Sequence, residues 1–223
     1  MSQADPATSA ELRKEWLRRE TEALAPLGFE HLRRDLYRLP LGEEWAGRVG
    51  LPKRAATGPA LMVYFDPPSA LLDHLPTQRL MRELYGLGAK DADAIILPGG
   101  WYGVPSNASL DAVSALRPSN LDEVDEAVGL SVRILTDEVV PWMTSQAGLD
   151  TLVATLGVPQ SSPGSEAKRL ETLAAVNLVK GDGEAARAAL NTLREEHMPT
   201  GIPSIDEPQE KYCRAIEERL RGM

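Results

Sequence analysis

A glycine-framed turn near the C-terminal end constrains the fold of this 223-residue chain more than any other feature. Two stretches with helical spacing, Glu166–Lys180 and Glu184–Glu196, are joined by the tripeptide Gly181-Asp182-Gly183. Gly181 can adopt the left-handed conformation that ends a helix, and Asp182 can cap the amides that begin the next one. The sequence therefore predicts a short helical hairpin.

Each helix of this hairpin carries one stripe of apolar and small residues. They recur at intervals of three and four, which places them on one helix face. The stripes consist of Ala167, Leu170, Leu173, Ala174 and Asn177 in the first helix, and of Ala185, Ala186, Ala189, Leu190 and Leu193 in the second. Small alanines let two helix axes approach closely. We expect both stripes to be buried.

The segment Asn177–Arg187 is similar to the inter-helix turn of tetratricopeptide repeats. The similarity extends over about thirty residues, roughly one repeat. A solenoid needs about three stacked repeats to bury a continuous core, and the sequence holds no second copy of this pattern. The resemblance therefore implies one helical hairpin packed on a domain and not a peptide-binding array.

Strand-like and helical patterns alternate upstream of the hairpin. Alternating or continuous apolar residues bounded by Gly and Pro predict strands, and spacings of three and four predict helices. The expected strands are Phe29–Leu39, Glu44–Leu51, Ala60–Phe65, Ala92–Leu97 and Leu110–Leu116. The expected helices are Ser9–Leu24, Ser69–Tyr85 with a break at Pro76, Asn120–Met143, Leu149–Leu156 and Gln209–Leu220. Ala60–Phe65 is the most continuous apolar run and is expected at the centre of the sheet.

This order predicts an α+β fold: a small, mainly antiparallel sheet with packed helices, followed by an α-helical C-terminal region. We expect a disordered lead at residues 1–9 and an α+β domain at 10–156. The helical hairpin and the C-terminal helix at 165–223 are expected to pack on the same domain. The order of elements within 10–156 resembles small uncharacterised bacterial proteins, some of which are proposed as immunity proteins for toxins. That resemblance implies a binding role and assigns no functional residue.

The charge balance and the apolar runs argue against two classes of partner. The formal net charge is −9, whereas a nucleic-acid binder needs a concentrated basic surface. The acidic excess lies after residue 54, an asymmetry that leaves a homo-oligomer open. The longest apolar runs fall far short of the roughly twenty residues of a membrane span. With no signal-peptide pattern at the N-terminus, we expect a cytoplasmic protein.

No motif with catalytic or metal-binding spacing occurs in the sequence. Cys213 is the only cysteine, which excludes a multi-cysteine zinc site, and it is expected to pack as a small hydrophobe. The histidines His31, His74 and His197 belong to no spaced ligand pattern. The acidic run Asp122–Glu126 suits the first turn of a helix, where carboxylates complement the dipole. We therefore expect no metal and no cofactor, and catalytic residues remain unknown.

Two groups of residues are candidates for binding. Trp101 and Tyr102 lie in the expected loop Pro98–Pro105, where adjacent aromatic side chains either anchor a partner or cover the sheet edge. Arginines on the first strand pair either form a basic face for an acidic partner or are ordinary solvated charges. These arginines are Arg33, Arg34, Arg38 and Arg48.

The sequence favours a non-enzymatic cytoplasmic bacterial protein that acts through protein–protein contacts, as an immunity-like protein or an adaptor. The alternative is an enzyme or small-ligand binder with a pocket between sheet and helices. A deep pocket with converging buried polar groups would favour that alternative, and a closed, dry interface would favour the interaction protein.

Overall fold

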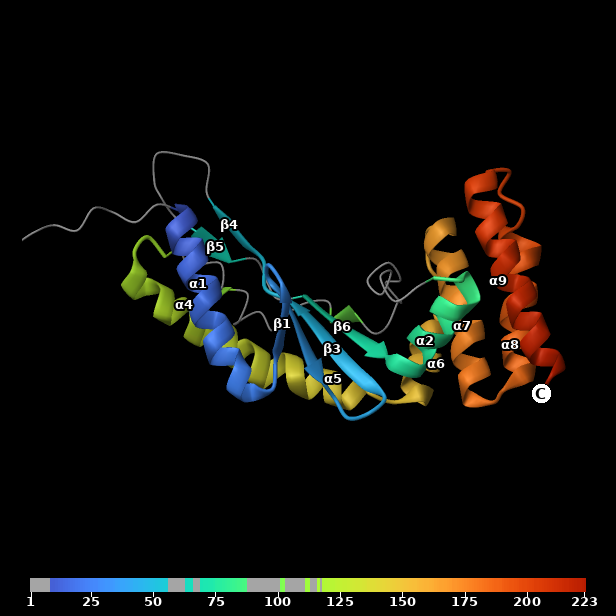
Figure 1. Ribbon diagram of the computed structural model, residues 1–223, viewed down its shortest axis with the longest axis horizontal. Coiled ribbons are helices and arrows are strands. Elements are labelled where there is room, and N and C mark those ends of the chain that lie inside the picture. Colours follow the sequence, from blue (N-terminus) through green and yellow to red (C-terminus); the bar gives the residue numbers. More distant parts are fainter. Residues whose placement is uncertain are drawn as a thin grey trace, which may run out of the picture. The chain divides into compact units, whose positions relative to one another are not determined.

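Two units that interleave along the chain make up the protein. The computed structural model describes residues 9–55, 63–65, 69–87, 101–102, 111–112, 116 and 118–223. Unit 1 comprises Met1–Leu72 and Trp101–Ser145, and unit 2 comprises Asp73–Gly100 and Gln146–Met223. Their helices and strands are labelled in Figure 1. The expected disordered lead falls on residues 1–8, outside the described residues, and on Ser9, where the first helix begins.

A five-stranded sheet forms the frame of unit 1. Its strands are β1 (Glu30–Arg33), β2 (Leu36–Pro40), β3 (Trp45–Gly50), β6 (Ser69–His74) and β7 (Trp101–Tyr102), in the order β1-β2-β3-β6-β7. The pairs β1–β2, β2–β3 and β6–β7 are antiparallel. A separate antiparallel pair consists of β4 (Lys53–Ala55) and β5 (Val63–Phe65). With the helices that follow, this is the α+β fold that the sequence predicts.

Three strand and helix predictions differ from the structure. The expected single strand Phe29–Leu39 is two strands, because Arg34 turns the chain with a left-handed backbone (φ 47°). The apolar run Ala60–Phe65 is not the centre of the sheet: its described part, β5, pairs with β4, and β3 lies centrally. An apolar run indicates burial but not the pairing partner. The first part of the expected helix Ser69–Tyr85 is strand β6, since a short apolar run fits either period.

The segment around Trp101 also differs from the prediction. Trp101 and Tyr102 are not in a loop but form β7, through backbone pairing with Leu71 and Ala70 of β6. Three further predictions fall largely outside the described residues: the rest of the loop Pro98–Pro105, the strand Ala92–Leu97 and the strand Leu110–Leu116. The described part of the last segment includes two helical residues, Asp111 and Ala112.

Helix α1 (Ser9–Leu24) and the long helix after Asn120 contact each other in unit 1 (Figure 1). The long helix consists of α4 (Leu121–Ile134), a π-helical turn (Leu135–Val139) and α5 (Val140–Gln146). The Asn120 side chain accepts hydrogen bonds from the amides of Asp122 and Glu123, both at 3.0 Å, and so caps the start of α4. Pro141 lacks an N–H and its ring crowds the carbonyl of Asp137, which gives a physical reason for the wider π turn.

Helices alone form the secondary structure of the described part of unit 2 after β6. They are α2 (Leu75–Tyr85), α6 (Leu149–Leu156), α7 (Pro163–Lys180), α8 (Gly183–His197) and α9 (Pro203–Arg221). Pro76 lies in the first turn of α2, where its fixed φ favours helix initiation over a break. Likewise, α9 begins at Pro203 and not at Gln209, and it continues through Pro208.

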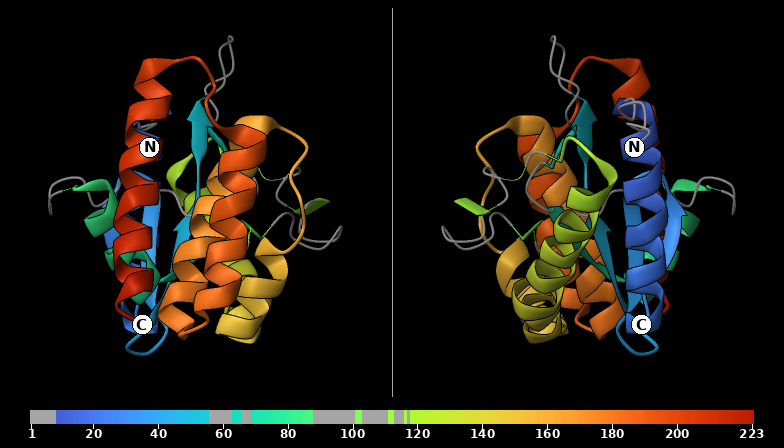
Figure 2. Two further views of the ribbon diagram at one scale, coloured as in Figure 1. Left: turned by 90° about the vertical axis from the view of Figure 1, so that its right-hand side faces the viewer. Right: turned by 90° about the vertical axis from the view of Figure 1, so that its left-hand side faces the viewer.

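The helical hairpin is confirmed in detail. Gly181 ends α7 in the left-handed conformation (φ 84°), and the Asp182 carboxylate accepts a hydrogen bond from the Ala185 amide at 3.0 Å. Helices α7 and α8 lie side by side (Figure 2). The predicted stripes are buried, except that Leu173 and Ala185 are only partly buried.

Helix α2 is held to the C-terminal helices by apolar and polar contacts. Leu80, Met81 and Leu84 belong to one buried cluster with residues of α7, α8 and α9. The Tyr85 hydroxyl donates a hydrogen bond to the buried Glu171 carboxylate, which also lies 3.1 Å from Lys168 Nζ. The domain boundary expected from the sequence, between residues 156 and 165, places α2 and α6 in the same domain as the sheet. In the structure both helices contact α7.

Candidate functional site

A shallow pocket lies at the turn between β1 and β2 in unit 1. Its volume is about 260 Å³. It is lined by Arg33, Arg34, Asp35, Leu36, Gly50, Leu51, Pro52 and Ser69. The turn supplies the two arginines, the end of β3 supplies Gly50, and the start of β6 supplies Ser69. We call this cavity the turn pocket.

Arg34 adopts an unusual backbone conformation at the rim of the turn pocket. Its φ of 47° lies in the left-handed region, which a non-glycine residue other than Asn or Asp rarely occupies. The Arg34 carbonyl oxygen lies 2.7 Å from His31 Nε2, so the protonated nitrogen donates to it and holds the turn. The Arg34 side chain itself is exposed.

A buried ion pair joins α1 to β4, and its lysine also lies near Asp35 of the turn. Lys53 Nζ is 2.6 Å from Glu20 Oε2, and both side chains are fully buried. The ammonium also donates to the Leu51 carbonyl at 2.9 Å, and the Tyr37 hydroxyl donates to Glu20 at 3.0 Å. Burial raises the pKa of Glu20, and burial with the neighbouring Glu20 charge raises the pKa of Tyr37.

Asp35 joins the buried pair to the turn pocket. Its carboxylate is 3.7 Å from Lys53 Nζ and 3.3 Å from the guanidinium of Arg13 on α1. Two cations therefore compensate the Asp35 carboxylate. Lys53 is sealed from solvent, so it cannot act as a nucleophile on a substrate and instead fixes the base of the turn. The arrangement is suited to binding an anion at the rim and not to covalent catalysis.

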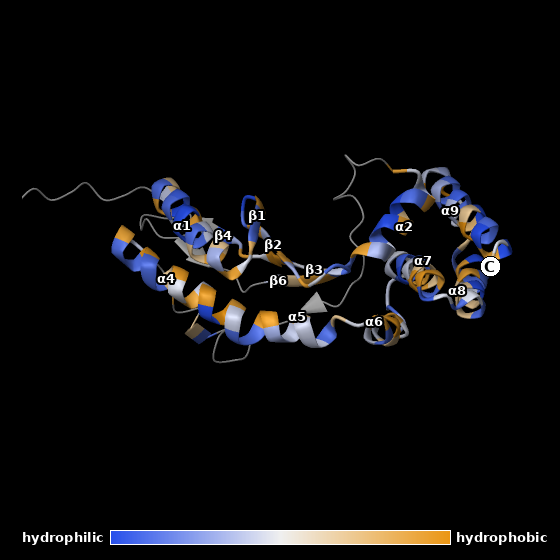
Figure 3. Cartoon of the chain, turned by 60° about the horizontal axis from the view of Figure 1, so that its bottom comes forward, coloured by the Kyte–Doolittle hydropathy of each residue, from blue (hydrophilic) through white to orange (hydrophobic). Residues whose placement is uncertain are grey.

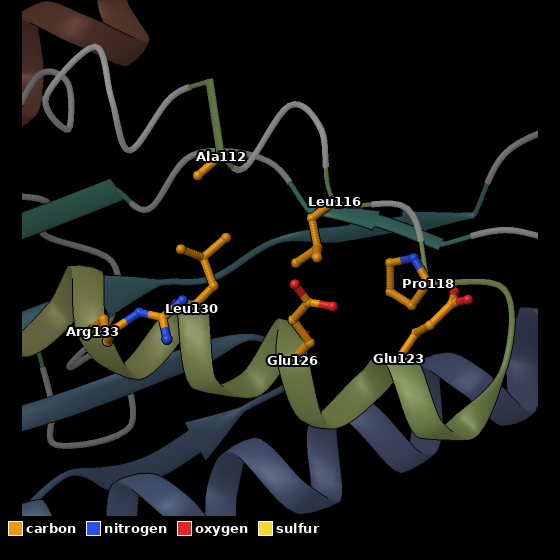
Figure 4. Close-up of a pocket in the computed structure, with 7 residues that line it drawn as sticks. All are labelled: Ala112, Leu116, Pro118, Glu123, Glu126, Leu130 and Arg133. Atoms are coloured by element: carbon orange, nitrogen blue, oxygen red, sulfur yellow. The ribbon is translucent and has the colours of Figure 1, made fainter.

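A second pocket of unit 1 runs along α4 (Figure 4) and has a volume of about 520 Å³. It is lined by Ala112, Leu116, Pro118, Glu123, Glu126, Leu130 and Arg133. Glu126 points from α4 toward Leu116, and Leu130 points toward Ala112. The Glu123 carboxylate accepts a hydrogen bond from the Ser119 amide at 2.7 Å, which lowers its pKa and commits it to the helix cap.

The aromatic and the arginine candidates from the sequence do not form one site. Arg33 and Arg34 line the turn pocket, whereas Arg38 on β2 pairs with Glu30 at 3.5 Å. Trp101 and Tyr102 lie on β7, at the opposite end of the strand order from β1. The structure therefore separates the aromatic pair from the arginines.

Sequence reasoning missed the buried charges. Glu20 lies at four-residue spacing in line with Leu12, Trp16 and Leu24, and all four are buried on one face of α1. A carboxylate in the middle of an apolar stripe is the signal that could have revealed it, because a buried charge requires a partner. Lys53 gives no such signal, since its neighbours in the sequence do not indicate its burial.

No cluster of three or more potential metal ligands occurs in the described ranges. His31 lies on β1, His74 ends β6 with its Nδ1 2.8 Å from Thr77 Oγ1, and His197 ends α8. Cys213 is fully buried, as expected for a small hydrophobe, and burial raises the pKa of its thiol to about 11. A thiol with a raised pKa is a poor nucleophile.

Comparison with known proteins found no matching family model, no similar curated protein and no similar solved structure. Within the residues that the structure describes, no helix has the length and apolar character needed to cross a membrane. The geometry of the two pockets and of the surface around β1 therefore carries the functional argument.

Proposed function

We propose that the protein is a non-enzymatic cytoplasmic bacterial protein that acts through protein–protein contacts, as an immunity-like protein or adaptor. The observation that carries this proposal is the exposure of β1. All four of its residues are exposed although the strand belongs to a sheet, and most of it is hydrophilic in Figure 3. Leu32, in the middle of the strand, is 43% exposed.

The surface that we propose for contact consists of Leu32 with Arg33, Arg34 and Arg38, and we call it the β1 surface. Its four members combine an exposed apolar side chain with guanidinium groups on the same hairpin. Arginines are over-represented among the residues that dominate interface energies, because they combine hydrogen bonding with apolar contact. The chain is acidic as a whole, whereas this surface holds three guanidinium groups against the Glu30 carboxylate that pairs with Arg38, so it is a locally basic region suited to an acidic partner.

The partner is expected to contact side chains and not to extend the sheet. The pairing of β1 with β2 shifts register between His31 and Arg33, which marks a bulge at the edge strand. Bulges and charged side chains are the features by which edge strands resist pairing with another strand.

A peptide titration on the full-length protein tests this proposal. A fluorescein-labelled peptide of alternating Glu and Leu is the probe, and its Lys and Leu counterpart is the charge-reversed control. We expect anisotropy to show binding of the acidic peptide only, with an affinity that falls as salt rises. The double variant Leu32→Ser/Arg38→Glu should lose about tenfold or more in affinity, whereas Lys211→Glu/Arg214→Glu in unit 2 should not. Equal binding by both variants, or none by the wild type, would overturn the proposal.

Small-ligand binding or catalysis in the second pocket of unit 1, which runs along α4, is the second candidate function. Its volume of about 520 Å³ lies within the range of ligand sites, and its described lining mixes carboxylates, the Arg133 guanidinium and apolar side chains. Native mass spectrometry of the purified protein tests it. Glu126 is an exposed lining residue, so Glu126→Ala should change the pocket and not the fold. A small molecule that the wild type retains and this variant loses would favour this candidate over the first.

A further inference from the structure

We propose that the turn pocket binds a single oxyanion, a carboxylate or a phosphate group, with Arg34 as its main ligand. This inference deepens the proposed function, and rests on it where the oxyanion belongs to a partner protein. Four features of the pocket support this site: the backbone of Arg34, the balance of charges, the missing side chain at residue 50 and the hydroxyl of Ser69.

The first feature is an arginine at a position where the backbone favours glycine. At a φ of 47° the Cβ of an L-residue crowds the following carbonyl, and glycine avoids this strain. The fold alone therefore gives no reason for arginine at this position. Residues held in such conformations cluster at binding sites, where the side chain has a use that offsets the strain. An exposed guanidinium at the rim of a cavity has an obvious use as a ligand for an anion.

The second feature is the charge facing the cavity. Among the described residues that line it, Asp35 is the acidic one, and an uncompensated carboxylate there would repel an anion. Arg13 at 3.3 Å and Lys53 at 3.7 Å compensate that carboxylate. With that carboxylate compensated, the exposed guanidinium of Arg34 gives its part of the rim a positive charge, even though Lys53 also neutralises Glu20.

The third and fourth features form the floor of the pocket. Gly50 lies on β3 opposite Leu36 of β2, and a Cβ at Gly50 would come within 2.6 Å of the Ser69 hydroxyl oxygen. The absence of a side chain at residue 50 therefore leaves space in front of that hydroxyl. A serine hydroxyl can donate one hydrogen bond to an oxyanion while guanidinium groups bind its other oxygens.

The test uses the full-length protein and measures both ligand binding and stability. Inorganic phosphate and acetate are titrated separately, and binding is followed by amide chemical shifts in NMR spectra. Thermal unfolding is measured without added anion. For wild type we expect the shifts to concentrate at residues 33–36, 50–52 and 69, and the stronger of the two anions identifies the preferred source of the oxyanion.

Arg34→Gly is the decisive variant, because the two readouts should move in opposite directions. Its melting temperature should equal or exceed that of wild type, since the strain is relieved, while anion affinity falls about tenfold or more. Arg34→Lys keeps the charge but not the planar fork, so its affinity should fall between the two. Gly50→Ala should also weaken binding while leaving both arginines in place. The control Arg214→Gln, in unit 2, removes one guanidinium and should leave affinity unchanged.

The outcomes separate this inference from the proposed function. A lowered melting temperature in Arg34→Gly, unchanged anion affinity in that variant, or an equal loss in Arg214→Gln would overturn the oxyanion site. If the site binds phosphate or acetate but the acidic peptide does not bind, the inference stands and the protein-contact proposal fails. If the peptide binds and neither Arg34→Gly nor Gly50→Ala alters anion or peptide binding, the inference fails alone.

Discussion

The two units bury their polar groups in different ways. Unit 2 has a core of leucines and small alanines, and its Lys168–Glu171 pair keeps the lysine one-third exposed. Unit 1 instead encloses the Lys53–Glu20 pair completely. Two charges removed from water lose hydration that their mutual attraction only partly replaces. Unit 1 is therefore the unit whose stability depends on both members of one ion pair, and unit 2 the one whose stability depends on packing.

The sharpest way to break this comparison is to remove the cation of the buried pair. Lys53→Met leaves Glu20 as an enclosed carboxylate without a counter-charge, and we expect unit 1 to lose about 3–5 kcal/mol of unfolding free energy at neutral pH. All four tryptophans belong to unit 1, so tryptophan emission during urea unfolding reports this unit. The loss should shrink toward acidic pH, where Glu20 binds a proton.

The matched control replaces both members of the pair. Glu20→Leu/Lys53→Met removes both charges and keeps apolar volume, and such replacements are often neutral or stabilising. We therefore expect the double variant to be close to wild type. A double variant as unstable as Lys53→Met would show that the loss arises from packing and not from the isolated charge.

The same contrast explains what could be read from the sequence. In α7 and α8 the period of 3.6 and the Gly181-Asp182 turn specify local structure, because their hydrogen bonds join residues close in sequence. In unit 1 the pairing of β5 and the position of β6 depend on partners distant in sequence, which a pattern of apolar residues does not encode. Strand register and pairing follow from tertiary contacts.

The candidate site could be predicted only in part. The sequence marked Arg33 and Arg34 as a basic face, and the structure places both at the turn pocket. It gave no indication of the left-handed backbone at Arg34. It also gave no indication of the buried Lys53–Glu20 pair, because the two residues are distant in sequence and meet only in the folded chain. Asp35, which lines the pocket and also lies near Lys53 of the buried pair, appears in the sequence as an ordinary turn residue.

In unit 2 the corresponding test is a cavity. Leu190 on α8 is 2% exposed within the apolar cluster, and Leu190→Ala should lower the unfolding free energy of unit 2 by about 3 kcal/mol through lost packing and a residual cavity. Far-UV circular dichroism, which reports the helices, measures this loss, and tryptophan emission provides the comparison for unit 1. The exposed variant Asn191→Ala, one residue away, is the control and should change stability little. A small effect of Leu190→Ala would contradict packing as the main stabilising term in unit 2.

A close contact between sheet and helix offers a milder test in unit 1. A Cβ added to Gly47 of β3 would overlap the Met143 side chain of α5. Gly47→Ala should therefore cost about 1–2 kcal/mol, at the lower end for overpacking because the thioether is the flexible end of the side chain. Met143→Ala removes the overlapping atoms, so the cost of Gly47→Ala measured in that background should disappear. Urea unfolding followed by tryptophan emission measures all four proteins, and an unchanged cost in the Met143→Ala background would refute the steric explanation.

The smallest expected effect compares one carboxyl of each unit through pH. Arg169 holds the pKa of Glu166, near the start of α7, at about 2, below its usual 4.5. A lowered folded pKa stabilises the protein above the unfolded pKa, and this contribution is lost as pH falls from about 4.5 toward about 2. Burial raises the pKa of Glu20, so its contribution has the opposite sign and stability falls as pH rises above 4.5.

Unfolding measurements on Glu166→Gln and Glu20→Gln test these opposite slopes. Glu166→Gln should be less stable than wild type at pH 6 and should approach it as pH is lowered, because protonation removes the same ion pair in the wild type. For Glu20→Gln the difference from wild type should shift in favour of the variant as pH rises, because the glutamine carries no charge that burial can penalise. Since the Glu166 side chain keeps 13% exposure and the Glu20 side chain none, added salt should reduce the effect of Glu166 more than that of Glu20. Parallel slopes for the two variants would mean that burial does not distinguish the two carboxyls, and the contrast between the units would then rest on packing alone.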